Sequence, residues 1–221
     1  MSKWMVAAKK ADFYAIAQQY HISPVMARII RNRDVIEEAD IRKFLHGTRQ
    51  ELYAPNLMKD MDKAVDILLD KIARNKKIRI IGDYDIDGVC STYILYKGLG
   101  NCGAKVDTAI PHRMKDGYGL NEHLIREAYE AGADTVLTCD NGIAAFSQIE
   151  YANSLGMTVV VTDHHEVPYE EKDTERQYLI PPAAAVVDPK QQDCHYPFPE
   201  ICGAVVAYKL VLALTAKRQG V

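Results

Sequence analysis

Five short clusters of polar residues each follow a short apolar run, and their residue types suit chemistry at a metal ion. The clusters are 82–88 (GDYDIDG), 111–113 (PHR), 139–142 (CDNG), 163–165 (DHH) and 188–189 (DP). Carboxylates and imidazoles together are ligands for Mn, Fe, Co or Zn ions. Several carboxylates with about one histidine per ion would suit a two-metal site that activates water against a phosphoryl group.

The aspartates of these clusters would repel one another if they met. Three alternate within 83–87, and Asp140 and Asp163 follow later apolar runs. Two carboxylates ~4 Å apart repel by about 4 kcal/mol at an effective dielectric of ~20. A group of them therefore needs either raised pKa values or a bound cation. The adjacent histidines 164–165 favour the cation.

Other interpretations of the same residues exist. The Asp-x-Asp-x-Asp-Gly pattern resembles the start of a calcium loop, but its twelfth position is Ile94 rather than glutamate. A lone aspartate after a strand often caps the next helix, which could explain Asp163 or Asp188. His112 could line the site, and 117–119 (GYG) is expected to be a turn whose Tyr118 could line the groove.

The elements that must position these clusters alternate along the chain. Strands are predicted at 78–81, 105–110, 135–138, 158–162 and 185–187. Helices are predicted at 61–75, 89–99, 122–131, 144–155 and 203–218. This alternation predicts an α/β fold with a mainly parallel sheet covered by helices on both faces. Ligands of such sheets bind outside the carboxyl edge, where all five clusters would converge.

The chain before this region is expected to be a small helical segment, with helices at 12–20, 24–31 and 34–45. Ser23 followed by Pro24 is typical of a helix start. We therefore divide the chain into a helical N-terminal segment, 1–58, and an α/β domain, 59–221. The polar, proline-bounded stretch 167–182 is expected to be a surface loop.

Composition limits the classes of protein. The chain has 221 residues, 48% of them hydrophobic and 26% charged, which is typical of a globular protein. The net charge of −3 is too mild to indicate a polyanion partner by itself, and it leaves a local basic groove possible. No signal peptide or membrane span is expected. The odd count of five cysteines, without CxxC spacing, favours reduced thiols in a cytoplasmic protein.

Four motifs, taken in order, resemble the DHH phosphoesterase family. The segments 82–88, 111–120 (PHRMKDGYGL), 138–142 (TCDNG) and 162–165 (TDHH) occur in the order and spacing of its RecJ-type members. The resemblance extends from about residue 50 onward. It implies a hydrolase of the single-stranded-DNA-specific 5′→3′ exonuclease type that acts in recombination and repair.

The resemblance also implies roles for individual residues. The ligands of a pair of Mn²⁺ or Mg²⁺ ions would be Asp85, Asp87, Asp140 and His164, and Asp87 or Asp140 could bridge the ions. His165 and Arg113 would contact phosphate, and His165 could also be a ligand. Asp83, Asp163 and Asn141 would orient the ligands by hydrogen bonds. The implied partner is single-stranded DNA, with a single-strand-binding protein and a helicase as further partners.

Three departures from the family pattern bear on these expectations. Asp188-Pro189 stands where Asn-Pro is usual, and Gly203-Ala204-Val205 stands where Gly-x-Gly is usual. The expected segment with a further aspartate ligand, and the DHHA1 and OB-like domains, do not occur before Val221. We therefore expect a DHH-domain fragment with little or no activity alone. The alternatives are a DHH phosphodiesterase that acts on oligoribonucleotides, cyclic dinucleotides or pyrophosphate, and a catalytically dead binding module.

Overall fold

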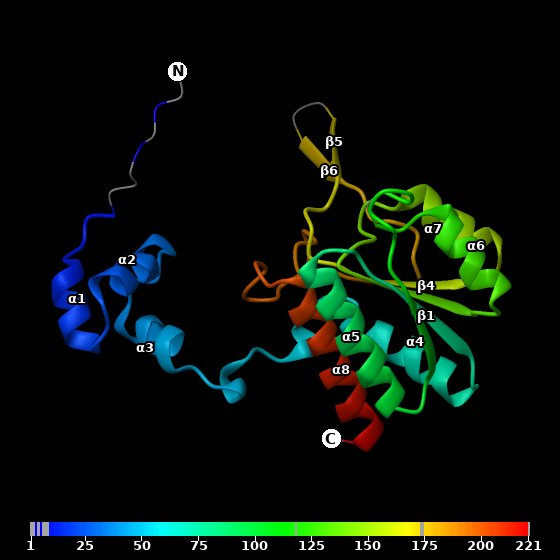
Figure 1. The fold of residues 1–221 in the computed structure, drawn as a ribbon, viewed down its shortest axis with the longest axis horizontal. Helices are drawn as coiled ribbons and strands as arrows, with labels where there is room; N and C mark the ends of the chain where they lie inside the picture. The colour runs from blue at the N-terminus through cyan, green and yellow to red at the C-terminus, as the bar shows by residue number, and fades with distance from the viewer. Residues whose placement is uncertain (1–2, 4, 6–8, 118, 173–174, 221) are drawn as a thin grey trace. The chain divides into compact units, whose positions relative to one another are not determined.

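The computed structural model describes residues 3, 5, 9–117, 119–172 and 175–220 (Figure 1). Contacts divide the chain into two units, Met1–Leu52 and Tyr53–Val221, which we call the N-terminal unit and the core unit. The sequence-based division at residue 58 stays a prediction.

The N-terminal unit contains three short helices, α1 (Phe13–Tyr20), α2 (Pro24–Asn32) and α3 (Glu38–His46). The Asp12 carboxylate accepts hydrogen bonds from two backbone N–H groups of α1, and the Ser23 hydroxyl accepts one from Met26 in α2. Both helices thus begin at side chains that satisfy their first N–H groups. The predicted helix at 34–45 begins later, because Asp34 has a positive φ of 57° that a helix cannot contain.

The core unit is built on a parallel sheet of five strands in the order β2-β1-β3-β4-β7. The strands are β1 (Lys77–Ile81), β2 (Lys105–Ala109), β3 (Thr135–Cys139), β4 (Thr158–Thr162) and β7 (Ala185–Val187). Every residue of β3 is buried, as expected for a strand covered on both faces. The predicted α/β class and parallel sheet are confirmed.

Two layers of helices cover the sheet (Figure 1). One layer consists of α4 (Met61–Ala73), α5 (Ile86–Asn101) and α8 (Gly203–Gln219), and the other of α6 (Glu122–Glu130) and α7 (Phe146–Ser154). Ile80 and Leu137 pack with the first layer, whereas Ile81 and Val136 pack with the second. Successive strand residues thus point to opposite faces of the sheet and contribute to two separate hydrophobic cores.

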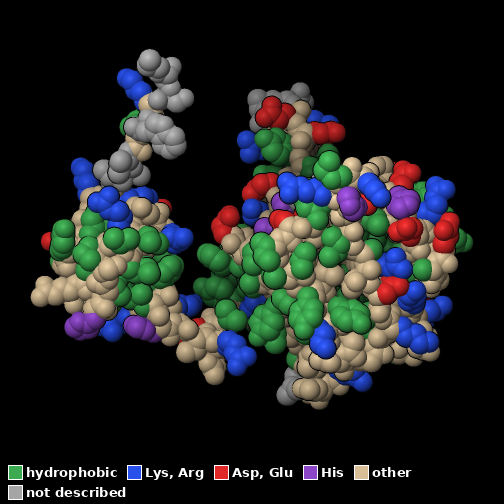
Figure 2. All heavy atoms as spheres, viewed as in Figure 1, with side chains coloured by type: hydrophobic (Ala, Val, Ile, Leu, Met, Phe, Trp, Pro, Cys, Tyr) green, Lys and Arg blue, Asp and Glu red, His purple; other side chains and the backbone are tan. Residues whose placement is uncertain are grey.

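The outer face of the first layer carries apolar side chains. Figure 2 shows them gathered over α5 and α8 of the core unit. The exposed ones include Tyr93 and Tyr96 of α5 and Leu212 of α8. Apolar side chains are thus exposed together on this part of the first helix layer.

A hairpin occupies part of the stretch that was predicted to be a surface loop. Its strands are β5 (Tyr169–Lys172) and β6 (Glu175–Tyr178), which pair antiparallel with Tyr169 opposite Tyr178. Those two rings lie 5.8 Å apart, and the Arg176 guanidinium lies over the Tyr169 ring. The sequence did not reveal these strands because nearly all their residues are exposed and most are charged, which removes the apolar alternation.

Two 3₁₀ turns, η1 (Arg49–Glu51) and η2 (Pro55–Leu57), lie in the connection between α3 and α4. Among the described residues, none of the helices combines the length and hydropathy that a bilayer crossing requires. All five cysteines are free thiols.

Candidate metal centre

Four of the polar clusters lie at the carboxyl edge of the sheet, where β1, β3, β4 and β7 end. They are 82–88, 139–142, 163–165 and 188–189. The strand order reverses between β1, which leads to the edge strand β2, and β3, which leads toward β7. Backbone hydrogen bonds between neighbouring strands continue past the ends of β3 and β4. Asp140 donates its N–H to the Thr162 carbonyl at 3.1 Å, and Asp163 donates its N–H to the Val187 carbonyl at 3.0 Å. The switch point of an α/β sheet is where ligands bind, and the predicted aspartates lie beside it.

Asp85 and Asp87 reach the site from the start of α5, where Asp85 precedes the helix and Asp87 lies in its first turn. The helix begins at Ile86, three residues earlier than predicted, because the Asp85 carboxylate caps it by accepting the Gly88 N–H at 2.9 Å. Asp87 accepts hydrogen bonds from the N–H groups of Gly203 and Ala204, at 2.7 and 2.8 Å. The start of α8 therefore fixes the orientation of the Asp87 carboxylate.

Asp140 lies at the centre of the cluster. It is buried, and its backbone has a positive φ of 60° that turns the chain away from β3. Its Oδ1 lies 2.9 Å from Nε2 of His164, and the same nitrogen lies 3.4 Å from Oδ2 of Asp87. Side chains that follow three different strands, β1, β3 and β4, thus converge at this point.

Asp163 orients the two histidines that follow it. Its Oδ2 accepts the Ile143 N–H at 2.9 Å, while its Oδ1 accepts the His164 N–H and lies 2.7 Å from Nδ1 of His165. The contact with Asp163 raises the pKa of His165 to about 9, against the opposing effect of burial. The hydrogen bond to Asp140 likewise raises the pKa of His164.

The electrostatics of the cluster suit a cation. Burial, strengthened by neighbouring carboxylates, raises the pKa values of Asp83 and Asp140. Both oxygens of Asp83 are buried, and the backbone N–H groups of Tyr84 and Gly119 offset the effect of burial only in part. Burying a carboxylate is costly, and a divalent ion would remove the remaining cost. The donor set of oxygen and imidazole nitrogen atoms fits Mn²⁺, and oxygen-rich sites also fit Mg²⁺.

Two overlapping groups could each hold an ion. One ligand atom from each of Asp83, Asp85 and Asp140 lies within 4.8 Å of the others, and the same is true of Asp140, His164 and His165. Asp140 belongs to both groups. A carboxylate shared between two ligand sets is the arrangement that a bridged pair of metal ions requires.

Comparison with known proteins agrees with this arrangement. Residues 77–220 match the model of the DHH family, N-terminal domain. The chain belongs to the DHH family. Its DHH motif is 163–165, whose first residue orients the other two.

Curated relatives and solved structures include several RecJ proteins. The chain is 40% identical to the single-stranded-DNA-specific exonuclease RecJ of Bacillus subtilis, over 96% of this chain and 26% of that protein. It is 32% identical to the same enzyme of Escherichia coli, over 87% of this chain and 31% of that protein. The chain thus spans about a quarter to a third of the length of these relatives.

Two RecJ structures with manganese share the fold. A crystal structure of exonuclease RecJ bound to manganese matches with a TM-score of 0.63 and 34% identity, over 77% of this chain and 40% of that one. RecJ from Thermus thermophilus in complex with Mn²⁺ also matches with a TM-score of 0.63, at 28% identity, over 95% of this chain and 27% of that one.

The remaining predicted residues of the DHH domain lie around the cluster. Asn141 donates from Nδ2 to the carbonyls of Ile81 and Cys139, at 3.2 and 2.9 Å, and so ties the ends of β1 and β3 together. Arg113 is exposed, and its guanidinium lies over the Tyr84 ring at 5.4 Å. The catalytic, metal-binding and phosphate-binding roles that we predicted for individual residues stay predictions.

Other sequence-based expectations are settled by local contacts. Asp163 and Asp188 cap no helix, since neither precedes one. Asp188 is completely buried, accepts the Lys190 N–H at 2.8 Å, and has its pKa raised to about 7 by burial. His112 accepts the Met114 N–H on Nδ1 within its own turn. Tyr118 lies outside the described residues.

Sequence reasoning missed the backbone groups that hold the acidic side chains. The N–H groups of Gly203, Ala204 and Ile143 position Asp87 and Asp163. Their sequence signal is weak: a glycine at the start of a helix and an apolar residue after Asn-Gly.

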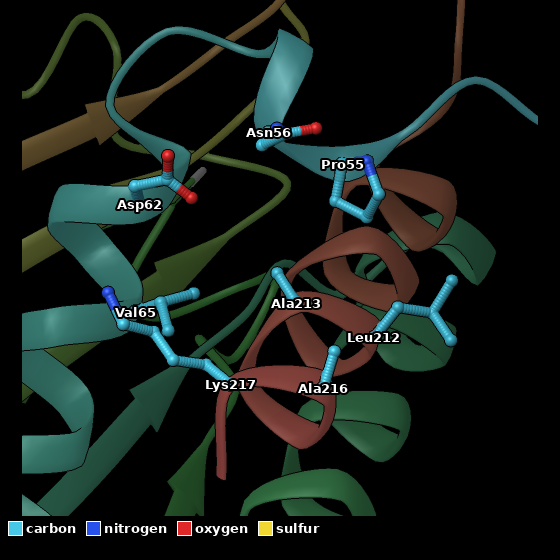
Figure 3. A pocket seen from close by; sticks show the side chains of 8 residues that line it. All are labelled: Pro55, Asn56, Asp62, Val65, Leu212, Ala213, Ala216 and Lys217. Atoms are coloured by element: carbon cyan, nitrogen blue, oxygen red, sulfur yellow. The ribbon is translucent and has the colours of Figure 1, made fainter. Parts of the chain in front are cut away.

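A separate pocket of the core unit lies away from the DHH motif. It has a volume of about 500 Å³ and lies between η2, α4 and the C-terminal half of α8, where Val65, Ala213 and Ala216 line it (Figure 3). Asp62 and Lys217 are its only charged lining residues among those described. It therefore lacks the convergent acidic and imidazole groups of a catalytic site.

Proposed function

We propose that this chain is the DHH part of a metal-dependent phosphodiesterase that removes nucleotides from the 5′ end of single-stranded DNA. The observation that carries the proposal is the position of Asp140, which belongs to both potential ligand groups and lies 2.9 Å from His164. The RecJ relatives, named as single-stranded-DNA-specific exonucleases, support the choice of substrate.

Asp85, Asp87, Asp140 and His164 would hold Mn²⁺ or Mg²⁺, two ions in the complete protein. The ions would supply an activated water and neutralise charge on the phosphate. Asp163 keeps His165 in place, and the proton on this histidine would stabilise negative charge on a phosphate oxygen. Arg113 would bind a phosphate beside Tyr84. Asp83 and Asn141 would hold the ligand-bearing loops in register.

The setting of this activity is part of the same proposal. The complete protein would act in the cytoplasm in recombination and repair, with a single-strand-binding protein and a helicase as partners. A helical N-terminal segment would precede the DHH domain, and DHHA1 and OB-like domains would follow it. Those domains would supply much of the affinity for DNA, which fits the net charge of −3 of the 221 residues described by this sequence.

Metal binding and hydrolysis test the proposal separately. Calorimetry should detect Mn²⁺ binding to the chain, and Asp140→Asn should weaken it at least 10-fold. His123→Ala, which removes an exposed histidine of α6, should leave it unchanged. On 5′-labelled single-stranded DNA, a protein that includes the remaining domains should release mononucleotides, and Asp140→Asn should slow release at least 100-fold.

Two results would contradict the proposal. Unchanged turnover in Asp140→Asn would show that Asp140 does not hold the metal ions that the proposed hydrolysis requires. A preference for dinucleotides or cyclic dinucleotides over single-stranded DNA would keep the metal chemistry and replace the substrate.

A further inference from the structure

We infer that a pocket on the α6–α7 side of the DHH motif binds the base of the terminal nucleotide, whatever its identity. This inference rests on the proposed function, because it places the nucleoside whose phosphate lies at the metal centre. The pocket has a volume of about 300 Å³. Its lining residues come from the loops before α6, between β3 and α7, and after β4, and from Gln148 of α7.

The pocket is continuous with the candidate metal centre. Asp163 and His165 line it, and the same two residues contact each other at 2.7 Å in the DHH motif. A phosphate that meets His165 would therefore have its nucleoside at the mouth of the pocket. The volume is at the lower end of the range for small-molecule sites, which suits one nucleoside rather than two.

The lining suits a planar ring with polar edges. Leu120 and Ile143 supply buried apolar walls, and Ala144 and Ala145 leave space between them because their side chains are small. Pockets of this kind, apolar with a few placed polar groups, are typical of sites for small ligands.

Asn141 supplies a hydrogen-bond acceptor of known orientation. The residue is 2% exposed and lines the pocket. Its Nδ2 is committed to two backbone carbonyls, while its Oδ1 is buried without a hydrogen bond to any described residue. A buried acceptor without a donor is costly. Each of the four bases carries an N–H donor on its Watson–Crick edge, so we expect each to satisfy this oxygen once binding of the ring opens the covered acceptor to the pocket.

A second phosphate is the competing occupant. The first residue of α7 is preceded by Ala145, which offers no side-chain cap, so the N–H groups of this helix terminus could attract an anion. However, the carboxylates of Asp163 and Glu166 also line the pocket, and the acceptor on Asn141 needs a donor. These groups favour an uncharged ring over an anion.

The test separates the contribution of the base from that of the phosphate. Binding of dAMP, dTMP, deoxyribose 5-phosphate and inorganic phosphate to the chain is measured by calorimetry, with Mn²⁺ and with a chelator. We expect each nucleotide to bind about 10-fold more tightly than deoxyribose 5-phosphate under both conditions, as for a stacked base. Ala144→Trp, which fills the pocket, should reduce the ratio of the deoxyribose 5-phosphate to the nucleotide dissociation constant from about 10 to about 1.

Ala131→Trp is the matched control, because Ala131 is also exposed but lies before β3, at the opposite edge of the sheet. It should keep the 10-fold ratio.

A ratio near 1 in the unmodified chain, or an unchanged ratio in Ala144→Trp, would overturn the inference. Inorganic phosphate that binds as tightly as the nucleotides would identify an anion site instead. If the ratio persists but Mn²⁺ strengthens no ligand, the pocket stands and the proposed function fails.

Discussion

Close packing of backbone and carboxylate shapes the candidate metal centre at the scale of single residues. A Cβ atom built on Gly203 would lie 2.7 Å from Oδ1 of Asp140, closer than non-bonded atoms approach. The absence of a side chain there lets α8 begin beside Asp140 and offer its N–H to Asp87. Glycine is needed at this position for close approach rather than for an unusual φ.

Gly203→Ala should therefore damage the metal centre. We expect the added methyl group to displace the Asp140 carboxylate and to weaken Mn²⁺ binding about 10-fold, measured by calorimetry. Gly100→Ala is the control, since a Cβ at that position of α5 meets nothing within 4 Å. The control should keep its Mn²⁺ affinity and gain roughly 0.5–1 kcal/mol of helix stability. Equal Mn²⁺ affinity in the two variants would show that Asp140 accommodates the methyl group.

At the scale of elements, ion pairs connect the edge strand β2 to its neighbour β1. Arg79 of β1 and Asp107 of β2 are direct neighbours in the register, and the guanidinium makes two contacts with the carboxylate. Lys77 lies 2.8 Å from the same carboxylate. Although burial opposes it, hydrogen bonding to Arg79 and Lys77 lowers the pKa of Asp107.

Asp107→Asn should lower the free energy of unfolding by roughly 1–2 kcal/mol at pH 7. Because the folded-state pKa is lowered, the stabilisation is complete above the unfolded pKa of about 4 and is lost as pH falls through the folded value. Urea unfolding at pH 7 and at pH 3 should therefore show a smaller difference between variant and parent at pH 3. A difference that stays constant with pH would exclude the charge of Asp107 as its source.

Element boundaries show where sequence reasoning reaches its limit. The strands were predicted within one residue because their apolar, β-branched runs are short and bounded by polar clusters. The start of α5 was missed, since Gly88 and the acidic 85–87 stretch are poor helix formers and only the cap at Asp85 reveals it. The β5–β6 hairpin was missed because its stabilising contacts are cross-strand pairs between exposed residues.

At the scale of the whole molecule, the convergence of the polar clusters could be predicted but their contacts could not. A parallel sheet places every strand end at one edge, whatever the order of its strands. The order β2-β1-β3-β4-β7, which puts the switch point between Asp85 and Asp140, depends on long-range packing. The contact between Asp87 and the start of α8 joins residues 116 positions apart, and no local pattern encodes it.

The start of the core unit also depends on long-range contacts, in this case with α8. Lys209 is 1% exposed, and its ammonium group donates a hydrogen bond to the Tyr53 carbonyl. The same ammonium lies 5.9 Å from the centre of the Tyr196 ring, which packs edge-to-face against Tyr53. Met58 is also buried in the core. Residues 53–58 therefore contribute contacts that the core unit needs.

Two truncated chains test this assignment. Removal of 1–52 should leave the free energy of unfolding of the core unit, and its Mn²⁺ affinity, unchanged. Removal of 1–58 should cost roughly 3–5 kcal/mol, because it exposes apolar surface around Met58 and leaves the buried Lys209 ammonium without its carbonyl. Urea unfolding followed by circular dichroism measures both. Equal stability of the two truncated chains would place the start of the core unit after residue 58, and the Lys209 contact would then contribute nothing to folding.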